Sequence, residues 1–203
     1  MEAIQIRRGR PADARDFAEL ALFTGMELLP ALFGSESNFK RTMIGSFPHR
    51  RNVFSHTHSQ FIEVDGRTAG MAQALTRAQI RAGQLRTMML MARYLKLAFL
   101  SQIPHLGRSS RIMVQIENGD SYLAHIATYP EFRSRGLGTR LMQAVEQEAR
   151  AAGSERIVLD VETDNTRAIE LYERLDFKIE ARSPALRIGR RHFEFYKMAK
   201  EMR

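Results

Sequence analysis

The chain contains no cysteine and only six prolines among its 203 residues. The absence of cysteine excludes disulfides, thiolate nucleophiles, cysteine-based zinc sites and cysteine-ligated iron–sulfur clusters. Long apolar runs are also absent, because Met88–Leu100 is interrupted by Arg93 and Lys96 and is too short to span a bilayer. The N-terminal MEAIQIRRGR has no apolar segment of the secretory kind. We therefore expect a cytoplasmic protein with no membrane partner.

What is present is an ordinary globular composition, with 44% apolar and 27% charged residues. A chain of this length can bury one good core, so we expect a single domain over residues 1–203. The net charge of +8 favours an anionic partner such as nucleic acid, a membrane surface or a polyphosphate cofactor. The basic residues are spread along the chain, so a solvated basic surface is equally compatible with them.

The first third of the chain predicts a short strand, helices and a hairpin. Residues 3–8 alternate as a strand, and Pro11 opens a helix with apolar residues at helical spacing. Further helical stretches are expected over 26–33 and 37–43, followed by a polar loop over 48–58. Asp65-Gly66 is the strongest hairpin signal in the chain, and it predicts strands at 59–64 and 67–76.

A methionine-rich segment over residues 78–104 predicts an inserted helix that is apolar on more than one face. Such a helix is expected either to be buried or to pack in a homodimer. A flexible lid or part of an acceptor pocket is the alternative, because methionine side chains adapt to irregular ligands.

The second half alternates strands and helices. A strand from residue 121 ends at Pro130, and a helix over 137–151 carries an apolar residue every fourth position. A strand over 155–161 follows, then a helix capped by Asn165. Strands over 177–182 and 192–198 close the chain as an antiparallel pair. This order predicts an α/β fold with a mixed sheet.

The segment RSRGLGTR, residues 133–140, lies between a predicted strand and a predicted helix. Glycines allow a ligand close to the backbone, and the start of a helix presents free N–H groups and a positive dipole end. The nearby arginines add charge, so the segment predicts an anion site. Leu141 replaces the third glycine of the dinucleotide fingerprint, and no Gly-Lys-Ser/Thr of a P-loop is present.

Two linked motifs carry a resemblance to a known family. Arg133-x-x-Gly136-x-Gly138 follows IATYPEF, and Asn165-x-x-Ala168-x-x-Leu171-Tyr172-x-x-x-x-Phe177 comes about thirty residues later. This pair resembles the acetyl-CoA pyrophosphate motif and the "N..A..LY...GF" motif of the GCN5-related N-acetyltransferase (GNAT) family. The resemblance implies the GNAT fold, a mixed central sheet of about seven strands with flanking helices and splayed strands 4 and 5. The family's glycine is Asp176 here, and aspartate tolerates the positive φ that this turn requires.

The resemblance also implies the roles of individual residues, with acetyl-CoA as cosubstrate and no metal. Backbone groups of the strand before the turn would hold the pantetheine arm and the acetyl oxygen, the turn would hold the pyrophosphate, and Asn165 would contact the pantetheine. The implied cofactor-binding residues are Ile126, Ala127, Thr128, Arg133, Ser134, Arg135, Gly136, Leu137, Gly138, Thr139 and Asn165.

The implied catalytic residues are Tyr172, as proton donor to the departing thiolate, and Tyr122. A phenol with a pKa of about 10 is protonated at neutral pH and can donate. The general base stays open among Glu117, Asp120 and His125; strand alternation predicts that His125 faces away from Tyr122. His56 and His58 have no third metal ligand in view, so we expect them in a polar loop.

The main functional hypothesis is an acetyl-CoA-dependent N-acetyltransferase that acts on a small-molecule or peptide amine by direct attack on the thioester. A catalytically silent CoA-binding regulatory module is the alternative, because no obvious base is present. Nucleic-acid binding through the net charge is not expected, since the chain offers no interleaved aromatic and basic platform.

Overall fold

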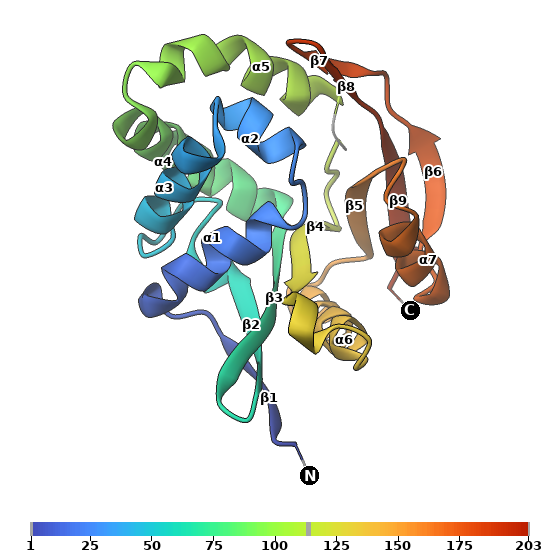
Figure 1. Ribbon diagram of the computed structural model, residues 1–203. Helices are drawn as coiled ribbons and strands as arrows, with labels where there is room; N and C mark the ends of the chain where they lie inside the picture. Colours follow the sequence, from blue (N-terminus) through green and yellow to red (C-terminus); the bar gives the residue numbers. More distant parts are fainter. Residues whose placement is uncertain (1, 113–114, 203) are drawn as a thin grey trace.

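In the computed structural model, which describes residues 2–112 and 115–202, a seven-stranded mixed sheet runs through the molecule (Figure 1). The strands lie in the order β1-β2-β3-β4-β5-β9-β6, and β4–β5 is the parallel pair. The predicted α/β fold is confirmed. The strands are β1 (Ile4–Arg8), β2 (Ser59–Val64), β3 (Arg67–Thr76), β4 (Asp120–Thr128), β5 (Arg156–Glu162), β6 (Lys178–Arg182) and β9 (Phe195–Glu201), with a small separate hairpin of β7 (Leu186–Ile188) and β8 (Arg191–Phe193).

The helices cover both faces of the sheet. They are α1 (Ala14–Leu22), α2 (Leu28–Phe33), α3 (Glu36–Ser46), α4 (Arg77–Leu95), α5 (Ala98–Ile112), α6 (Leu137–Ala151) and α7 (Thr166–Arg174). Phe61 and Met71 pack into the cluster with α1 and α3, whereas their neighbours Ile62 and Ala72 pack into the cluster with α6. Because side chains alternate along a strand, the α1–α3 layer and the α6 layer lie on opposite faces.

The β2–β3 hairpin has the predicted bounds. Asp65 and Gly66 have φ of 48° and 76°, the left-handed geometry that a tight two-residue hairpin needs. The turn residues therefore determine this part of the fold locally.

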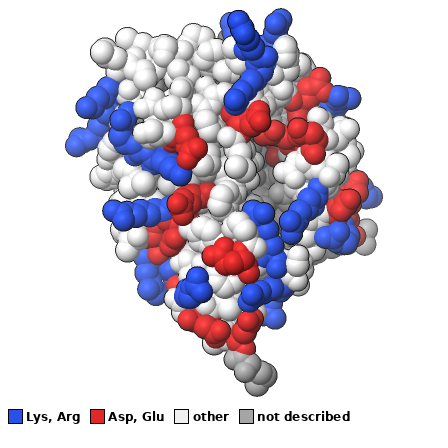
Figure 2. All heavy atoms as spheres, in the orientation of Figure 1, with Lys and Arg blue, Asp and Glu red and all other residues white. Residues whose placement is uncertain are grey.

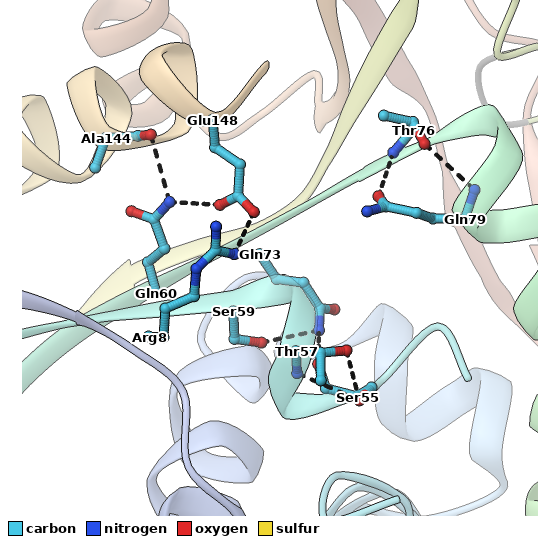
Figure 3. Close-up of polar contacts among 10 residues, drawn as sticks. All are labelled: Arg8, Ser55, Thr57, Ser59, Gln60, Gln73, Thr76, Gln79, Ala144 and Glu148. Atoms are coloured by element: carbon cyan, nitrogen blue, oxygen red, sulfur yellow. Dashed lines mark hydrogen bonds and ion pairs between the residues drawn. The ribbon is translucent and has the colours of Figure 1, made fainter. Parts of the chain in front are cut away.

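Polar contacts attach α6 to the first two strands (Figure 3). The Glu148 carboxylate forms an ion pair with Arg8 of β1 and accepts a hydrogen bond of 2.5 Å from Gln60 Nε2 of β2. Gln60 Nε2 also donates to the carbonyl of Ala144 at 3.4 Å. These contacts fix the direction of α6 and thereby the place of its N-terminus.

The single helix predicted over 78–104 is wrong in one respect, because the segment forms two helices, α4 and α5, that extend to Ile112. Lys96 separates them with φ of 54°, a conformation that ends a right-handed helix. No glycine or proline lies at this break, so no local sequence signal predicts it. Among the described residues, none of the helices combines the length and apolar character needed to cross a bilayer.

The close packing of α3 on α4 makes a specific stability prediction. A Cβ added at Gly45 of α3 would lie 2.3 Å from Cζ of Tyr94 on α4. We expect Gly45→Ala to lower the free energy of unfolding by about 1–3 kcal/mol, the usual cost of overpacking. Gly107→Ala in α5 is the matched control, because no atom lies within 4 Å of its added Cβ. That control should gain up to about 1 kcal/mol from helix propensity. Urea unfolding measures both, and equal effects would contradict the packing argument.

Candidate functional site

A cavity of about 570 Å³ lies beside the C-terminal half of β4, the start of α6 and one face of α7. Every cofactor-binding residue expected from the sequence lines this cavity except Arg135. The lining residues among them are Ile126, Ala127, Thr128, Arg133, Ser134, Gly136, Leu137, Gly138, Thr139 and Asn165. The structure thus brings together two motifs that are about thirty residues apart.

The N-terminus of α6 forms one wall of this cavity. Gly136 caps the helix with φ of 71°, and the backbone N–H of Arg140 makes the bond to its carbonyl at 3.2 Å. The N–H groups of Leu137, Gly138 and Thr139 precede that bond and are not used within the helix. Together with the positive end of the helix dipole, they give this wall of the cavity the chemistry that suits an anion.

The arginines around the cavity differ from the sequence expectation. Arg133 lines it, with its guanidinium 5.8 Å from the ring centroid of Phe23. Arg135 is turned away and pairs with Glu2 at 3.0 Å. Two arginines that the sequence analysis missed, Arg167 and Arg174 of α7, also line the cavity.

A sequence signal for these missed residues does exist. Arg167, Glu170, Leu171 and Arg174 are spaced i, i+3, i+4 and i+7 and therefore share one helix face. Phe23, which also lines the cavity, has no such signal because it comes from the distant end of α1.

Strands β4 and β5 separate beside the cavity. Residues Asp120–Tyr122 of β4 pair with Arg156–Val158 of β5, and the pairing stops there. Strand β4 nevertheless continues to Thr128 and β5 to Glu162. On its other side β4 stays paired with β3 as far as Thr128. The splay leaves one edge of Leu123–Thr128 unpaired with β5 and open to a ligand that hydrogen-bonds to the backbone.

The Asn165 motif has the local geometry expected from the sequence. Asn165 Oδ1 accepts a hydrogen bond of 3.2 Å from the N–H of Ala168, so the predicted helix cap is confirmed. Asp176 has φ of 67°, which confirms that aspartate adopts the conformation usual for the family's glycine. The substitution therefore leaves the turn after α7 intact.

Tyr172 lies on the inner face of α7, behind Ala168 and Leu171, and does not itself line this cavity or the one that adjoins it. It is buried and packs against Phe177 with ring centroids 5.7 Å apart. Burial raises the pKa of its hydroxyl above the ordinary value of 10. The hydroxyl makes no hydrogen bond to any other residue that the structure describes, so it carries an uncommitted proton at neutral pH.

Tyr122 is near Tyr172 but is already engaged. Its hydroxyl donates to Asp160 Oδ2 on β5 at 3.2 Å. Burial raises the pKa of Tyr122 well above 10, and the Asp160 carboxylate raises it further, with a smaller effect from Tyr172. Both tyrosines therefore stay protonated. Of the two, Tyr122 donates its hydroxyl hydrogen to a carboxylate of the described residues, and Tyr172 does not.

The expected orientation of His125 is wrong. Leu123 and Ile126, three positions apart, both pack in the α6 layer, because the register of β3–β4 shifts between Gln73 and Ala74. This bulge interrupts the alternation, so His125 faces the α1 layer. Tyr122 faces the same layer, because it is the neighbour of Leu123, which faces the α6 layer. His125 Nδ1 is 2.8 Å from Thr24 Oγ1.

The three candidate bases have structural surroundings that do not suit a base in this cavity. Burial lowers the pKa of His125 to about 4. Asp120 is buried in a 2.9 Å ion pair with Arg156 at the start of β4. Glu117 lies in the same ion-pair group and is 69% exposed. None of the three lines the cavity beside α6.

A second cavity of about 540 Å³ adjoins the first and shares Phe23 and Asn165 with it. Three segments that are distant in sequence form its walls: residues 23–27 after α1, 162–165 after β5, and 192–194. Its carboxylates are Glu27, Glu162, Asp164 and Glu194. Glu27 and Glu194 have ion-pair partners in Arg191 and Arg182.

Glu162 stands out among these carboxylates because it is half-buried at the end of β5, where the strands have splayed. Burial raises its pKa above the ordinary carboxyl value, and Asp164 and Glu27 raise it further. A carboxylate with a raised pKa beside a cavity is a candidate proton acceptor, and sequence reasoning missed it.

No metal site accompanies these cavities. Within residues 2–112 and 115–202, no group of three or more histidine or acidic side chains is placed to hold a metal ion. His56 lies in a short 3-10 turn with its Nδ1 3.1 Å from the carbonyl oxygen of Phe47. Burial lowers the pKa of His58 in the same turn.

Comparisons with known proteins agree with this geometry. The model of the Acetyltransferase (GNAT) family matches residues 29–177. The chain is also 41% identical over 56 residues to N-alpha-acetyltransferase 30 of Schizosaccharomyces pombe. That match covers 28% of this chain and 37% of the relative's length.

Solved structures share the fold over nearly the whole chain. A crystal structure of an acetyltransferase is similar with a TM-score of 0.64 and 23% identity, covering 98% of this chain and 100% of that one. The Salmonella typhimurium protein yncA, determined with its cofactor acetyl-CoA, has a TM-score of 0.58 and 15% identity. It covers 99% of this chain and 95% of its own. At these identities the similarity concerns the fold.

Proposed function

Because the chain belongs to the GNAT acetyltransferase family, we propose that it transfers the acetyl group of acetyl-CoA to an amine. The observation that carries the proposal is the pair of adjoining cavities, one built around the N-terminus of α6 and the other lined by carboxylates. The first suits an anionic donor, and the second suits a basic acceptor. We also propose that residues 1–203 form one acetyltransferase domain, since β1 and β9 belong to one sheet.

The first cavity fits acetyl-CoA chemically. The N–H groups of Leu137, Gly138 and Thr139 face the cavity as donors for a pyrophosphate, and Arg133 adds a cation beside them. The unpaired edge of β4 around Ile126–Thr128 offers backbone groups to an amide-containing arm. Arg167 and Arg174 also line the cavity and could bind further phosphate groups. When bound, acetyl-CoA supplies an activated thioester.

The two tyrosines have different proposed roles. Tyr172 acts as general acid, because its hydroxyl is protonated and uncommitted to another described residue. Tyr122 is the last residue of β4 that pairs with β5, and its hydroxyl keeps its proton in the hydrogen bond to Asp160. Arg135, which pairs with Glu2, contributes to the positive potential and makes no direct contact with the cavity.

The second cavity is the proposed acceptor site, and Glu162 is its proposed base. The acceptor nitrogen attacks the thioester carbonyl, a C–N bond forms and the C–S bond breaks. The amine proton passes to the Glu162 carboxylate, directly or through water, and Tyr172 protonates the departing thiolate. The balance is one amide and one thiol formed from one amine and one thioester. A peptide N-terminus is the first acceptor to test, because the S. pombe relative bears the name of an N-alpha-acetyltransferase.

The proposed base predicts a change in pH dependence. A base works in its ionised form, so kcat/KM should rise with pH through a pKa above the ordinary carboxyl range, as the raised pKa of Glu162 requires. Glu162→Gln should lower kcat/KM by about 10²-fold and remove this acidic limb. Glu194→Gln is the matched control, because Glu194 lines the same cavity and is paired with Arg182. An unchanged limb in Glu162→Gln would exclude Glu162 as the base.

A thiol-release assay with acetyl-CoA against pooled amines and short peptides tests the activity itself. Transfer to any amine supports the enzyme. Tight binding of acetyl-CoA by calorimetry together with no transfer would assign the silent CoA-binding module. No heat and no thermal shift at millimolar acetyl-CoA would refute both.

A further inference from the structure

Helix α4 is apolar on two opposite faces. Its inner face is buried against the protein through Gly83, Thr87, Leu90, Met91 and Leu95. Its outer face carries an exposed stripe at positions i, i+4, i+7, i+11 and i+14, which follows one side of a helix with 3.6 residues per turn. The stripe residues are Ala78, Ala82, Leu85, Met89 and Ala92.

The bulky members of this surface are strongly exposed. Leu85 is 69% and Met89 is 60% exposed on α4. At the corner and on α5, Leu97 is 86% and Leu100 is 67% exposed, followed by Ile103 at 45%. Single exposed apolar residues are ordinary, but side chains that recur along two consecutive helices indicate a surface for contact.

The charged residues of α4 and α5 beside this apolar surface are all basic. Between Arg77 and Gln115 the sequence has no aspartate or glutamate. Arg81 lies along one flank of the stripe, and Arg86 and Arg93 lie along the other, as the 100° rotation per residue dictates. None of these arginines forms an ion pair with a carboxylate in the described part of the chain. The upper left of the space-filling view, over α5, likewise shows white and blue and no red (Figure 2).

The start of the stripe is held in place by a capping box. Thr76 Oγ1 accepts a bond from the N–H of Gln79 at 3.3 Å, and Gln79 Oε1 accepts one from the N–H of Thr76 at 2.8 Å (Figure 3). The packing of Tyr94 over Gly45 holds the other end of α4. The outer face is therefore presented by a fixed helix.

We propose that the outer face of α4 and the start of α5 bind an anionic phospholipid surface, which reverses the expectation from the sequence that the protein has no membrane partner. The apolar side chains would enter the boundary between headgroups and acyl chains, and the flanking arginines would extend to the phosphates while their stems cover apolar surface. A second copy of this chain is a poor occupant, because a symmetric contact would place basic flank against basic flank. This contact does not depend on acetyl transfer.

The test is co-sedimentation of the full chain with vesicles of mixed phosphatidylserine and phosphatidylcholine, beside vesicles of phosphatidylcholine alone. We expect binding to the mixed vesicles that falls as salt increases. The double substitution Arg86→Gln with Arg93→Gln should weaken it by about fivefold for each arginine. Leu85→Gln with Met89→Gln should weaken it by about tenfold or more.

The matched control is Arg15→Gln with Arg150→Gln, which removes the same charge from exposed positions on α1 and α6. Its binding should match that of the parent chain within a factor of about two, because these arginines lie outside the proposed lipid-binding surface of α4 and α5. If this control and Arg86→Gln with Arg93→Gln lose vesicle binding equally, the net charge of the protein explains the binding, and the proposed site is overturned. Equal binding to both vesicle types would also overturn it. So would a dimer in sedimentation equilibrium that dissociates on Leu85→Gln with Met89→Gln, or preference for a synthetic acidic amphipathic peptide over mixed vesicles.

Discussion

Replacing Tyr172 with phenylalanine is expected to lower kcat for acetyl transfer by about 10²- to 10⁴-fold, the usual contribution of a positioned general acid. The phenol is buried and its pKa is raised, so it is protonated at neutral pH and can donate a hydrogen bond and a proton as negative charge develops on the sulfur. The departing thiolate receives this proton as the C–S bond breaks. Removing the hydroxyl leaves this thiolate without a donor from Tyr172.

The binding of acetyl-CoA should change little in Tyr172→Phe, because phenylalanine keeps the ring that packs on Phe177. Calorimetry measures the dissociation constant, and steady-state rates give kcat. Tyr122→Phe is the comparison, since its hydroxyl is bonded to Asp160 and is not assigned as the donor. A small fall in kcat for Tyr172→Phe beside a larger fall for Tyr122→Phe would reverse the two roles.

Placing a negative charge in the proposed anion site should weaken the binding of acetyl-CoA substantially. A Cβ at Gly138 would meet only Leu171 at 3.5 Å, an ordinary contact, so a side chain can be accommodated without a clash with the chain. Gly138→Asp then directs a carboxylate toward the position proposed for the pyrophosphate. Repulsion of about 1–4 kcal/mol per unit charge at about 4 Å corresponds to a loss of about fivefold to 10³-fold.

Gly138→Asn separates charge from size, because asparagine has nearly the shape of aspartate and no charge. The difference in dissociation constant between the two variants measures the electrostatic part alone, and it should shrink as salt increases. If both variants bind acetyl-CoA equally, the start of α6 does not hold its phosphates. The unfolding free energies of the two variants should agree, which shows that the fold is not responsible.

Several features of the fold were predictable because their cause is local. The bounds of β2 and β3 follow from the left-handed turn at Asp65-Gly66. Helix α6 spans 137–151, as its four-residue apolar spacing predicted. The positive φ of Asp176 follows from the turn that ends α7. In each case neighbouring residues in the sequence create the geometry, so a short window contains the information.

Other features could not be predicted because distant segments decide them. The helix break at Lys96 lacks glycine and proline, and the bulge that reorients His125 arises from the pairing of β4 with β3. A register shift depends on a partner strand some fifty residues away in the chain. Strand alternation alone therefore placed His125 on the wrong face.

The sequence by itself determined the family, the α/β order and the segment that lines the cavity at the start of α6, because turn residues, caps and helical spacing act over a few neighbouring positions. Only the tertiary structure decided that Arg133 and not Arg135 lines the cavity, and that Glu162 meets the loop after α1. It also decided which apolar face of α4 is covered and which stays exposed. The physical reason is that burial, and the pKa shifts and surfaces that follow from it, depend on contacts between segments far apart in the chain.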